Sequence, residues 1–307
     1  MVNCQQTIKN ETRFRGVGLH SGQKVEAVLK PAPVDSGIVF VRTDVSPPVP
    51  IPALNSNVVD TRFSTTLGKG SVVVATVEHL MSVIWGLGID NLIAEVNGPE
   101  IPILDGSGLI FAKKIRKAGI KKQIRPRRYF VITKPVSVTA EDERYGYLLP
   151  SRSQKFTCSI QFHHPLIQRQ SIEFHLNEKN YYKEIARART FGFLKDVERL
   201  RQKGLISGGS LANAIVLDDE KVLNQEGLRF QDEFVRHKVL DTIGDVALMG
   251  MRILGHFMTH KAGHELHYRL IQKALIEECG YILGAFEDAE KDDSLTVLSP
   301  LHQLVSA

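Results

Sequence analysis

The sequence predicts an α+β chain made of two similar halves. Its 307 residues exceed one typical core, so two domains of about 100–150 residues each are the natural expectation. Strand patterns followed by helical patterns occur twice along the chain. We therefore expect an N-terminal α+β domain at 1–125, a C-terminal α+β domain at 126–286 and a polar tail at 287–307.

The first half begins with strand and turn patterns. Residues 24–31, KVEAVLKP, alternate between apolar and polar, and the four prolines of VSPPVPIPAL require extended backbone. The segment VVATVEHLMSVIWGLGI has apolar residues at helical spacing, which predicts a helix through Glu78 and His79 that stops near Gly86 and Gly88. A strand over NLIAEV, a tight turn and a short helix after Ser107 should follow.

A strongly basic run separates the two halves. Residues 113–128, KKIRKAGIKKQIRPRR, contain nine Lys or Arg residues and no acid. We interpret the run as a solvated linker at the domain boundary. Nucleic-acid binding is the alternative, although the run has no interleaved aromatic residues on which bases could stack.

The second half repeats the order of strands followed by helices. YFVITKPVSVTA, YGYLLP and FTCSIQFHHP read as strands. A long helix is expected from Glu233 to about Leu254, slightly weakened by Gly244 and Gly250. Phe191, Phe193, Leu194 and Val197 stand at near-helical spacing, ahead of a glycine-rich turn at 208–209.

Composition excludes several classes of protein. Three isolated cysteines without a C-x-x-C pair argue against a disulfide framework and against a cysteine zinc site. No apolar run approaches the roughly 20 residues that span a bilayer, and the N-terminus has no signal-peptide pattern. We expect a cytoplasmic protein with no transmembrane segment. The net charge of +5 is compatible with an anionic ligand.

Spacing suggests one candidate metal site. His237 and Asp241 are four residues apart on the expected long helix, so they share one face, and Asp245 extends the same stripe. Hydrolytic zinc sites use three protein ligands and keep one position open. His79 would supply the third ligand, with the neighbouring Glu78 as general base.

Other patterns compete with this site. His256 and His260 are also four apart, and His264 and His267 are three apart, so spacing alone does not choose among the histidines. The glycine-rich stretches GVGLHSG and ISGGSLANA lack the full nucleotide-binding fingerprints and are expected to be turns.

Several motifs together resemble one enzyme family. These are GVGLHSG, VEHLMSV (77–83), GPEIPILDGSG (98–108), ARARTFGF (186–193), RHKVLDTIGD (236–245) and KAGHELH (261–267). In their order and spacing they resemble the UDP-3-O-acyl-N-acetylglucosamine deacetylases, enzymes of lipid A biosynthesis. The resemblance implies two layered α/β sandwich domains with the active site at their junction. It also implies zinc-dependent release of acetate from a UDP-linked acylated glucosamine by a monomeric enzyme.

The resemblance assigns roles to individual residues. The zinc ligands would be His79, His237 and Asp241, which leaves His256, His260 and His267 outside the metal site. The catalytic residues would be the general base Glu78, the cation or general acid His264, its orienting carboxylate Asp245, and Thr190, whose hydroxyl polarises the scissile carbonyl.

The resemblance also implies a substrate-binding surface. Lys238 matches a substrate-binding lysine, Phe162 offers a stacking surface for uracil, and Arg144 could replace a nucleotide-side lysine. The walls of an acyl-chain passage would include Phe191, Phe193, Val197, Ile206 and Ala214. Two other functions remain as alternatives: a zinc amidohydrolase acting on another N-acyl sugar or nucleotide, and a nucleic-acid-binding protein built around residues 113–128.

Overall fold

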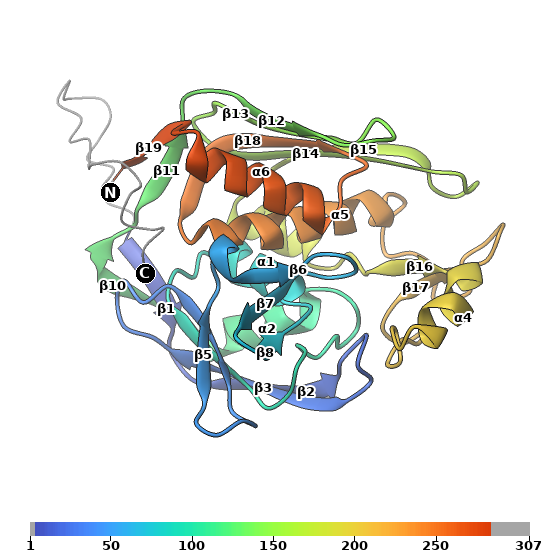
Figure 1. Ribbon diagram of the computed structural model, residues 1–307, viewed down its shortest axis with the longest axis horizontal. Coiled ribbons are helices and arrows are strands. Elements are labelled where there is room, and N and C mark those ends of the chain that lie inside the picture. The colour runs from blue at the N-terminus through green and yellow to red at the C-terminus, as the bar shows by residue number, and fades with distance from the viewer. Residues whose placement is uncertain (1–3, 284–307) are drawn as a thin grey trace.

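The computed structural model describes residues 4–283, and the predicted tail at 287–307 lies outside this range. The chain forms four layers, in the order sheet, helices, helices, sheet (Figure 1). This arrangement confirms the α+β class. Among residues 4–283, no helix has the length and apolar character needed to cross a membrane.

The lower layers come from the first half of the chain. One sheet has five strands in the order β2 (Thr12–Val17), β3 (Lys24–Pro31), β9 (Leu92–Val96), β4 (Ile38–Arg42) and β5 (Val49–Pro52). A short 3₁₀ turn (Asn55–Asn57) leads to a three-stranded sheet of β6 (Val58–Asp60), β7 (Thr66–Lys69) and β8 (Val72–Val74). The helices are α1 (Glu78–Gly86) and α2 (Leu109–Ala118).

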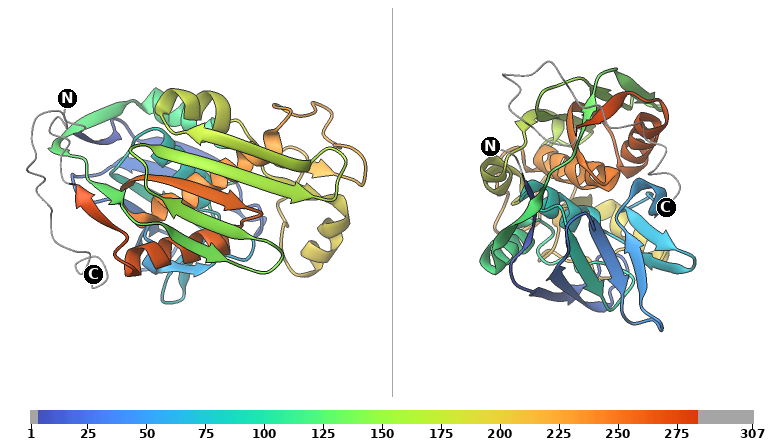
Figure 2. Two further views of the ribbon diagram at one scale, coloured as in Figure 1. Left: turned by 90° about the horizontal axis from the view of Figure 1, so that it is seen from above. Right: turned by 90° about the vertical axis from the view of Figure 1, so that its left-hand side faces the viewer.

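The upper layers come from the second half. Helices α5 (Glu233–Val246) and α6 (His264–Ile276) pack beneath a seven-stranded sheet whose outer face is uncovered (Figure 2). β18 (Arg252–His260) is central and pairs with three strands: β11 (Tyr129–Ile132), β13 (Tyr145–Leu149) and β14 (Gln154–Phe162). The outer strands are β12 (Val136–Thr139), β15 (Gln168–His175) and β19 (Gly280–Leu283).

Smaller elements connect and extend these layers. β1 (Cys4–Ile8) and β10 (Ile120–Pro126) form an antiparallel ribbon. A helical turn (α3, Glu178–Asn180) and a π-helical turn (Tyr181–Ile185) precede a lobe at one end of the molecule. The lobe consists of β16 (Phe191–Phe193), α4 (Leu194–Gln202) and β17 (Ile215–Leu217).

The two central helices, α1 and α5, pack against each other across the junction of the halves. Gly244 of α5 makes this approach possible, because a Cβ atom there would overlap the backbone carbonyl of Glu78. α1 is buried along its whole length, and 12 of the 14 residues of α5 are buried. The hydrophobic effect therefore fixes both helices in place.

Several expected elements are confirmed. The helix through Glu78 and His79 ends at Gly86, and Gly88 follows it with a left-handed φ of 76°. ISGGSLANA is a turn as expected, whereas GVGLHSG begins with the end of β2 and turns only at 19–21. The two turns pack on each other, since the N–H groups of Ser207 and Gly208 donate to the carbonyls of His20 and Leu19.

Three expectations about local structure are wrong. The helix expected over Glu233–Leu254 stops at Val246, where a 3₁₀ turn (Ala247–Met249) and the left-handed Gly250 lead into β18. The apolar residues after Met249 fit a buried strand as well as a helix, so periodicity misassigned them. Phe191 and Phe193 lie on strand β16, and α4 begins only at Leu194.

The basic run is the third correction, because it is not a linker. It forms the second half of α2 and all of β10, and its exposed side chains include Ile124, which is 92% exposed. The predicted division at residues 125 and 126 stays a prediction. It falls at the end of β10, just before β11 enters the second sheet at Tyr129.

Candidate active site and metal centre

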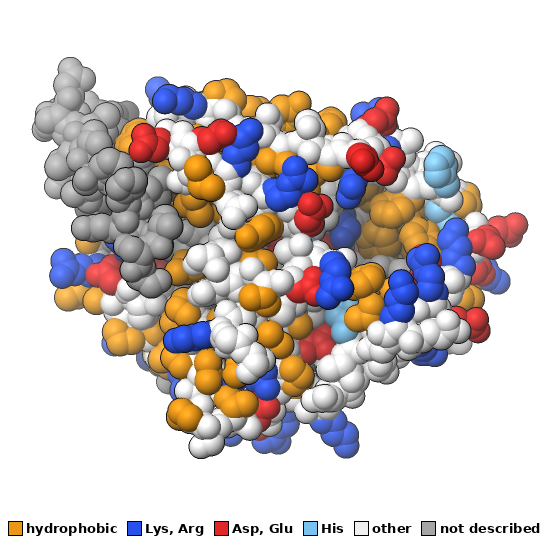
Figure 3. All heavy atoms as spheres, viewed as in Figure 1, with side chains coloured by type: hydrophobic (Ala, Val, Ile, Leu, Met, Phe, Trp, Pro, Cys, Tyr) orange, Lys and Arg blue, Asp and Glu red, His pale blue; other side chains and the backbone are white. Residues whose placement is uncertain are grey.

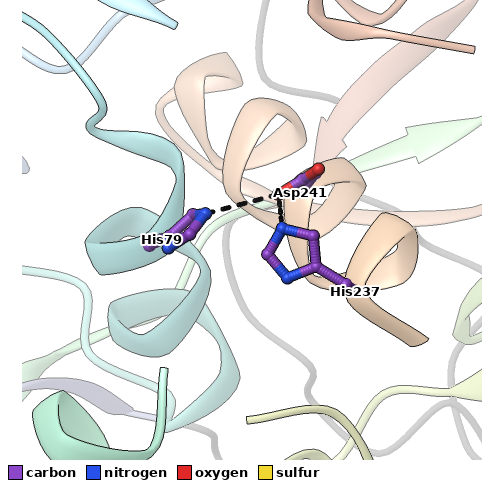
Figure 4. A group of neighbouring side chains, drawn as sticks. All are labelled: His79, His237 and Asp241. Atoms are coloured by element: carbon purple, nitrogen blue, oxygen red, sulfur yellow. Dashed lines mark ion pairs between the residues drawn. The ribbon is translucent and has the colours of Figure 1, made fainter. Parts of the chain in front are cut away.

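Three side chains from the two central helices meet at the junction of the halves. His79 projects from the first turn of α1, while His237 and Asp241 project from one face of α5 (Figure 4). Asp241 Oδ1 lies 3.2 Å from His237 Nε2 and 3.7 Å from His79 Nε2. Donor atoms of a tetrahedral zinc site lie roughly 3.3 Å apart, given bond lengths of about 2.0–2.2 Å. The spacing therefore fits a metal ion.

The hydrogen bonds of His237 and Asp241 use the atoms that point away from the centre of the group, so that His237 Nε2 and Asp241 Oδ1 remain able to bind a metal ion. Lys238 donates to Asp241 Oδ2 at 2.8 Å, and His237 Nδ1 donates to the Ala188 carbonyl at 3.2 Å. A partner on Nδ1 leaves Nε2 as the lone-pair nitrogen, which is the usual arrangement of a metal-binding histidine. Within residues 4–283, the buried Asp241 Oδ1 has no hydrogen-bond partner.

The charges of the three residues also suit a cation. Burial lowers the pKa of His79 to about 3 and lowers that of His237, so both imidazoles are neutral. Burial alone would raise the pKa of Asp241, but the neighbouring His237 and Lys238 hold it well below its usual range. Two neutral imidazoles and one ionised carboxylate are ordinary metal ligands.

A second group of possible metal ligands lies where α5 meets the start of α6. It consists of Asp245, one turn beyond Asp241 on α5, and of His264 and His267 on the first turn of α6. Asp245 Oδ2 accepts hydrogen bonds from Nδ1 of both histidines at 2.8 Å, and Asp245 Oδ1 accepts from the Thr65 hydroxyl at 2.6 Å. Because the carboxylate is already fully engaged, this group is a hydrogen-bonded network, whereas the first group has unused ligand atoms.

Glu78 and His264 face each other beside the first group. Glu78 Oε1 lies 3.9 Å from His264 Nε2, and Glu78 Oε2 accepts from the Thr65 backbone N–H at 3.0 Å. Burial, with help from Asp245 and Asp241, raises the pKa of Glu78 to about 8. Burial opposes the charge on His264, but Asp245 and Glu78 raise its pKa to about 9. A cation bound by the adjacent His79 would lower both values.

An aromatic cluster adjoins the three candidate metal ligands on the side of the lobe. The Phe162 ring lies 5.6 Å from that of Phe191 and 5.7 Å from that of Phe193. Phe191 in turn lies 6.5 Å from the ring of His237, with Lys238 Nζ 5.7 Å above it. Figure 3 shows a hollow on this face that is lined by apolar side chains and bordered by Lys and Arg side chains.

The remaining predicted residues lie on the lobe or at its base. Thr190 is fixed through its backbone, which donates to Gly106 and accepts from Ile215, both at 2.8 Å. Val197, Ile206 and Ala214 are half-buried residues of the lobe, on α4 and the segment that returns to β17. Arg144 immediately precedes β13 and lines a surface pocket with Tyr145 and His260, a pocket that contains none of these lobe residues.

Sequence reasoning missed several residues that support the site. Thr65 contacts both Glu78 and Asp245, and His267 shares Asp245 with His264. Arg189 and Glu233 form a buried ion pair at 2.9 Å, which anchors the start of α5 to the irregular segment that leads into β16. The motif ARARTFGF contains Arg189, but neither its spacing nor its composition indicates a partner 44 residues away.

Comparison with known proteins identifies the family. A family model described as UDP-3-O-acyl N-acetylglycosamine deacetylase matches residues 5–276. The chain belongs to this family. It is 51% identical to the UDP-3-O-acyl-N-acetylglucosamine deacetylase of Myxococcus xanthus, over 90% of this chain and 88% of that protein. Proteins of the same name from Hahella chejuensis and Legionella pneumophila are 49% and 51% identical, over 93% and 89% of this chain and 95% and 90% of theirs.

Proposed function

We propose that the protein is a zinc-dependent deacetylase that hydrolyses the N-acetyl group of UDP-3-O-acyl-N-acetylglucosamine and thereby commits the substrate to lipid A biosynthesis. The relatives' names supply the reaction and the substrate. One observation carries the proposal: the unpartnered Asp241 Oδ1 faces His79 and His237, directly beside Glu78 and His264.

His79, His237 and Asp241 would hold the zinc ion. When bound, zinc supplies Lewis-acid polarisation of the acetyl carbonyl and lowers the pKa of the attacking water toward about 7. Lys238 neutralises the second oxygen of Asp241, so that one oxygen stays directed at the ion. The ligand set and the proton-transfer pair come from a single chain, so the proposed monomeric enzyme would need no residue from a second copy.

Glu78 and His264 divide the proton transfers between them. Glu78 Oε1 is the free oxygen of its carboxylate and accepts the proton of the attacking water. His264 is held at Nδ1 by Asp245, so its Nε2 carries the proton that faces the cleft. That proton stabilises the oxyanion and is then donated to the departing amine. The Thr190 hydroxyl assists at the carbonyl.

The substrate's other parts would occupy the neighbouring surface. Phe162, Phe191 and Phe193 offer aromatic faces near the metal ligands, and Lys238 stands over Phe191. The acyl chain would extend into the lobe along Val197, Ile206 and Ala214. Each buried methylene contributes about 0.8 kcal/mol, so a long acyl chain adds substantially to binding.

The proposal is tested by metal analysis and product detection on the purified protein. We expect about one zinc per chain, and mass-spectrometric release of acetate from the acylated UDP-sugar. Iron in place of zinc would correct the metal while leaving the reaction standing. Equal turnover of N-acetylglucosamine derivatives that lack the UDP or the 3-O-acyl group would instead favour a general amidohydrolase.

A further inference from the structure

Thr65 links the two groups that move protons, although they come from different halves of the chain. It lies between β6 and β7, and it is only 2% exposed. Its carbonyl accepts from the N–H of Val77 at 3.2 Å, and its own N–H donates to Glu78 Oε2 at 3.0 Å. Two backbone hydrogen bonds thus fix Thr65 against the start of α1.

The side chain of Thr65 points to the other half. Its hydroxyl donates to Asp245 Oδ1 at 2.6 Å, a short distance typical of a hydrogen bond to an ionised carboxylate. Asp245 Oδ2 is shared by Nδ1 of His264 and Nδ1 of His267. With both oxygens engaged, the carboxylate cannot rotate without breaking at least one hydrogen bond.

These contacts restrain both proton-transfer groups. The Thr65 N–H occupies one oxygen of Glu78 and leaves the other 3.9 Å from His264 Nε2. The Thr65 hydroxyl fixes the carboxylate that orients the His264 ring. A single residue therefore sets the position of the base relative to the acid.

We propose that Thr65 is a positioning residue for deacetylation, acting through Glu78 and through Asp245 on His264. The proposal rests on the proposed function for its reaction. Thr65 makes one contact through its hydroxyl, to Asp245, and one through its backbone N–H, to Glu78. A substitution removes the hydroxyl contact and leaves the backbone contact in place. The effect of a substitution is therefore confined to the Asp245 and His264 side.

Thr65→Val removes the hydroxyl and keeps the shape of the side chain. For the hydrogen-bond partners of metal-ligating residues, such a loss typically costs about 10- to 100-fold in activity, and we take the same range for this partner of Asp245. We expect kcat to fall in that range, with KM and bound metal close to wild type. Thr65→Ser keeps the hydroxyl and should restore most of kcat.

The matched control is Thr7→Val. Thr7 is also a buried threonine, 3% exposed, whose hydroxyl accepts from the N–H of Ala32 far from the site. It should lose stability without a selective loss of kcat. If Thr65→Val does not fold, the ratio of kcat between Thr65→Ser and Thr65→Ala isolates the hydroxyl, and a ratio near one overturns the proposal.

An NMR measurement that needs no catalytic activity tests the positioning role of Thr65 independently of the proposed function. In protein labelled with ¹⁵N-histidine, the Nδ1–H signals of His264 and His267 report their hydrogen bonds to Asp245, and they are assigned with His264→Asn and His267→Asn. Thr65→Val should shift or broaden these signals, and Thr65→Ser should not. Unchanged signals in Thr65→Val overturn the positioning role, even if the wild type fails to release acetate.

Discussion

The close packing of α1 on α5 makes Gly244→Ala a sharp test of how the site is assembled. In an exposed helix interior, replacing Gly by Ala stabilises by about 1 kcal/mol. Here the new Cβ would overlap the Glu78 carbonyl oxygen and lie 2.8 Å from its carbonyl carbon. Moving that carbon out to the 3.4 Å of ordinary van der Waals contact requires a shift of about 0.6 Å, and clearing the closer carbonyl oxygen requires a larger one, so about 0.6 Å is the minimum displacement.

That shift matters because α1 carries His79 and α5 carries His237 and Asp241, the other two proposed ligands. Ligand distances in well-formed metal sites lie within about 0.2 Å of their typical values. Overpacking a tight core costs about 1–3 kcal/mol, which exceeds the gain in helix propensity. We therefore expect Gly244→Ala to lower both the free energy of unfolding and the zinc affinity.

The assay combines urea unfolding of the metal-free chain with competition for zinc against a chelator of known affinity. Gly192→Ala is the control, since a Cβ there meets no atom within 4 Å. Stability raised by about 1 kcal/mol in Gly244→Ala, with zinc affinity unchanged, would show that the helices have room and that their contact does not set the ligand geometry.

Four further predictions follow from the site. His79→Ala, His237→Ala and Asp241→Ala should each lower bound zinc and activity together, measured by metal analysis and acetate release; full zinc in all three would refute the ligand set. Glu78→Ala and His264→Ala should keep nearly normal zinc and lose about 100-fold or more in turnover, while unchanged pH–rate profiles in both would contradict their roles. In the metal-free chain, the pKa of His264 is raised from 6.5 to about 9, so its contribution to stability is complete below about pH 6.5 and is lost as the pH rises through 9. Urea unfolding across that range should show a shallower decline in His264→Gln, and an equal slope would refute the coupling to Asp245. Ala214→Trp should lower kcat/KM far more for a long-chain substrate than for one lacking the acyl chain, whereas an equal loss on both would place the passage elsewhere.

Apolar spacing and glycine positions predicted which helices and strands exist better than they predicted the residues at which those elements begin and end. The buried helix α1 and the strands of both halves follow from apolar spacing and glycine positions. The segment after Val246 was misassigned because a buried strand and a buried helix are both apolar on every side. The basic run was misread for a different reason: charge shows that β10 and the end of α2 are exposed, but it does not show that they are regular structure.

The residues of the candidate site also fall into those that the sequence predicts and those that only the fold brings together. The pair His237 and Asp241 is visible in the sequence because four residues on a helix place them on one face. The meeting of α1 with α5 is a property of the fold. The sequence could therefore offer His79 only as one candidate beside the other histidines, and the family resemblance chose it. Thr65 had no signal at all, because one of its two decisive contacts is made by a backbone N–H that every residue except proline carries.

The buried carboxylates at the junction of the two halves favour a bound cation there. Glu78, Asp241 and Asp245 are all less than 4% exposed, and buried carboxylates are costly unless they are paired. Lys238 pairs with Asp241, and Asp245 holds His264 and His267, but Asp241 Oδ1 and Glu78 Oε1 still face the shared space. A divalent cation at His79, His237 and Asp241 would offset that remaining negative charge and join α1 to α5. Its binding free energy would therefore stabilise the contact between the two halves as well as supply the chemistry.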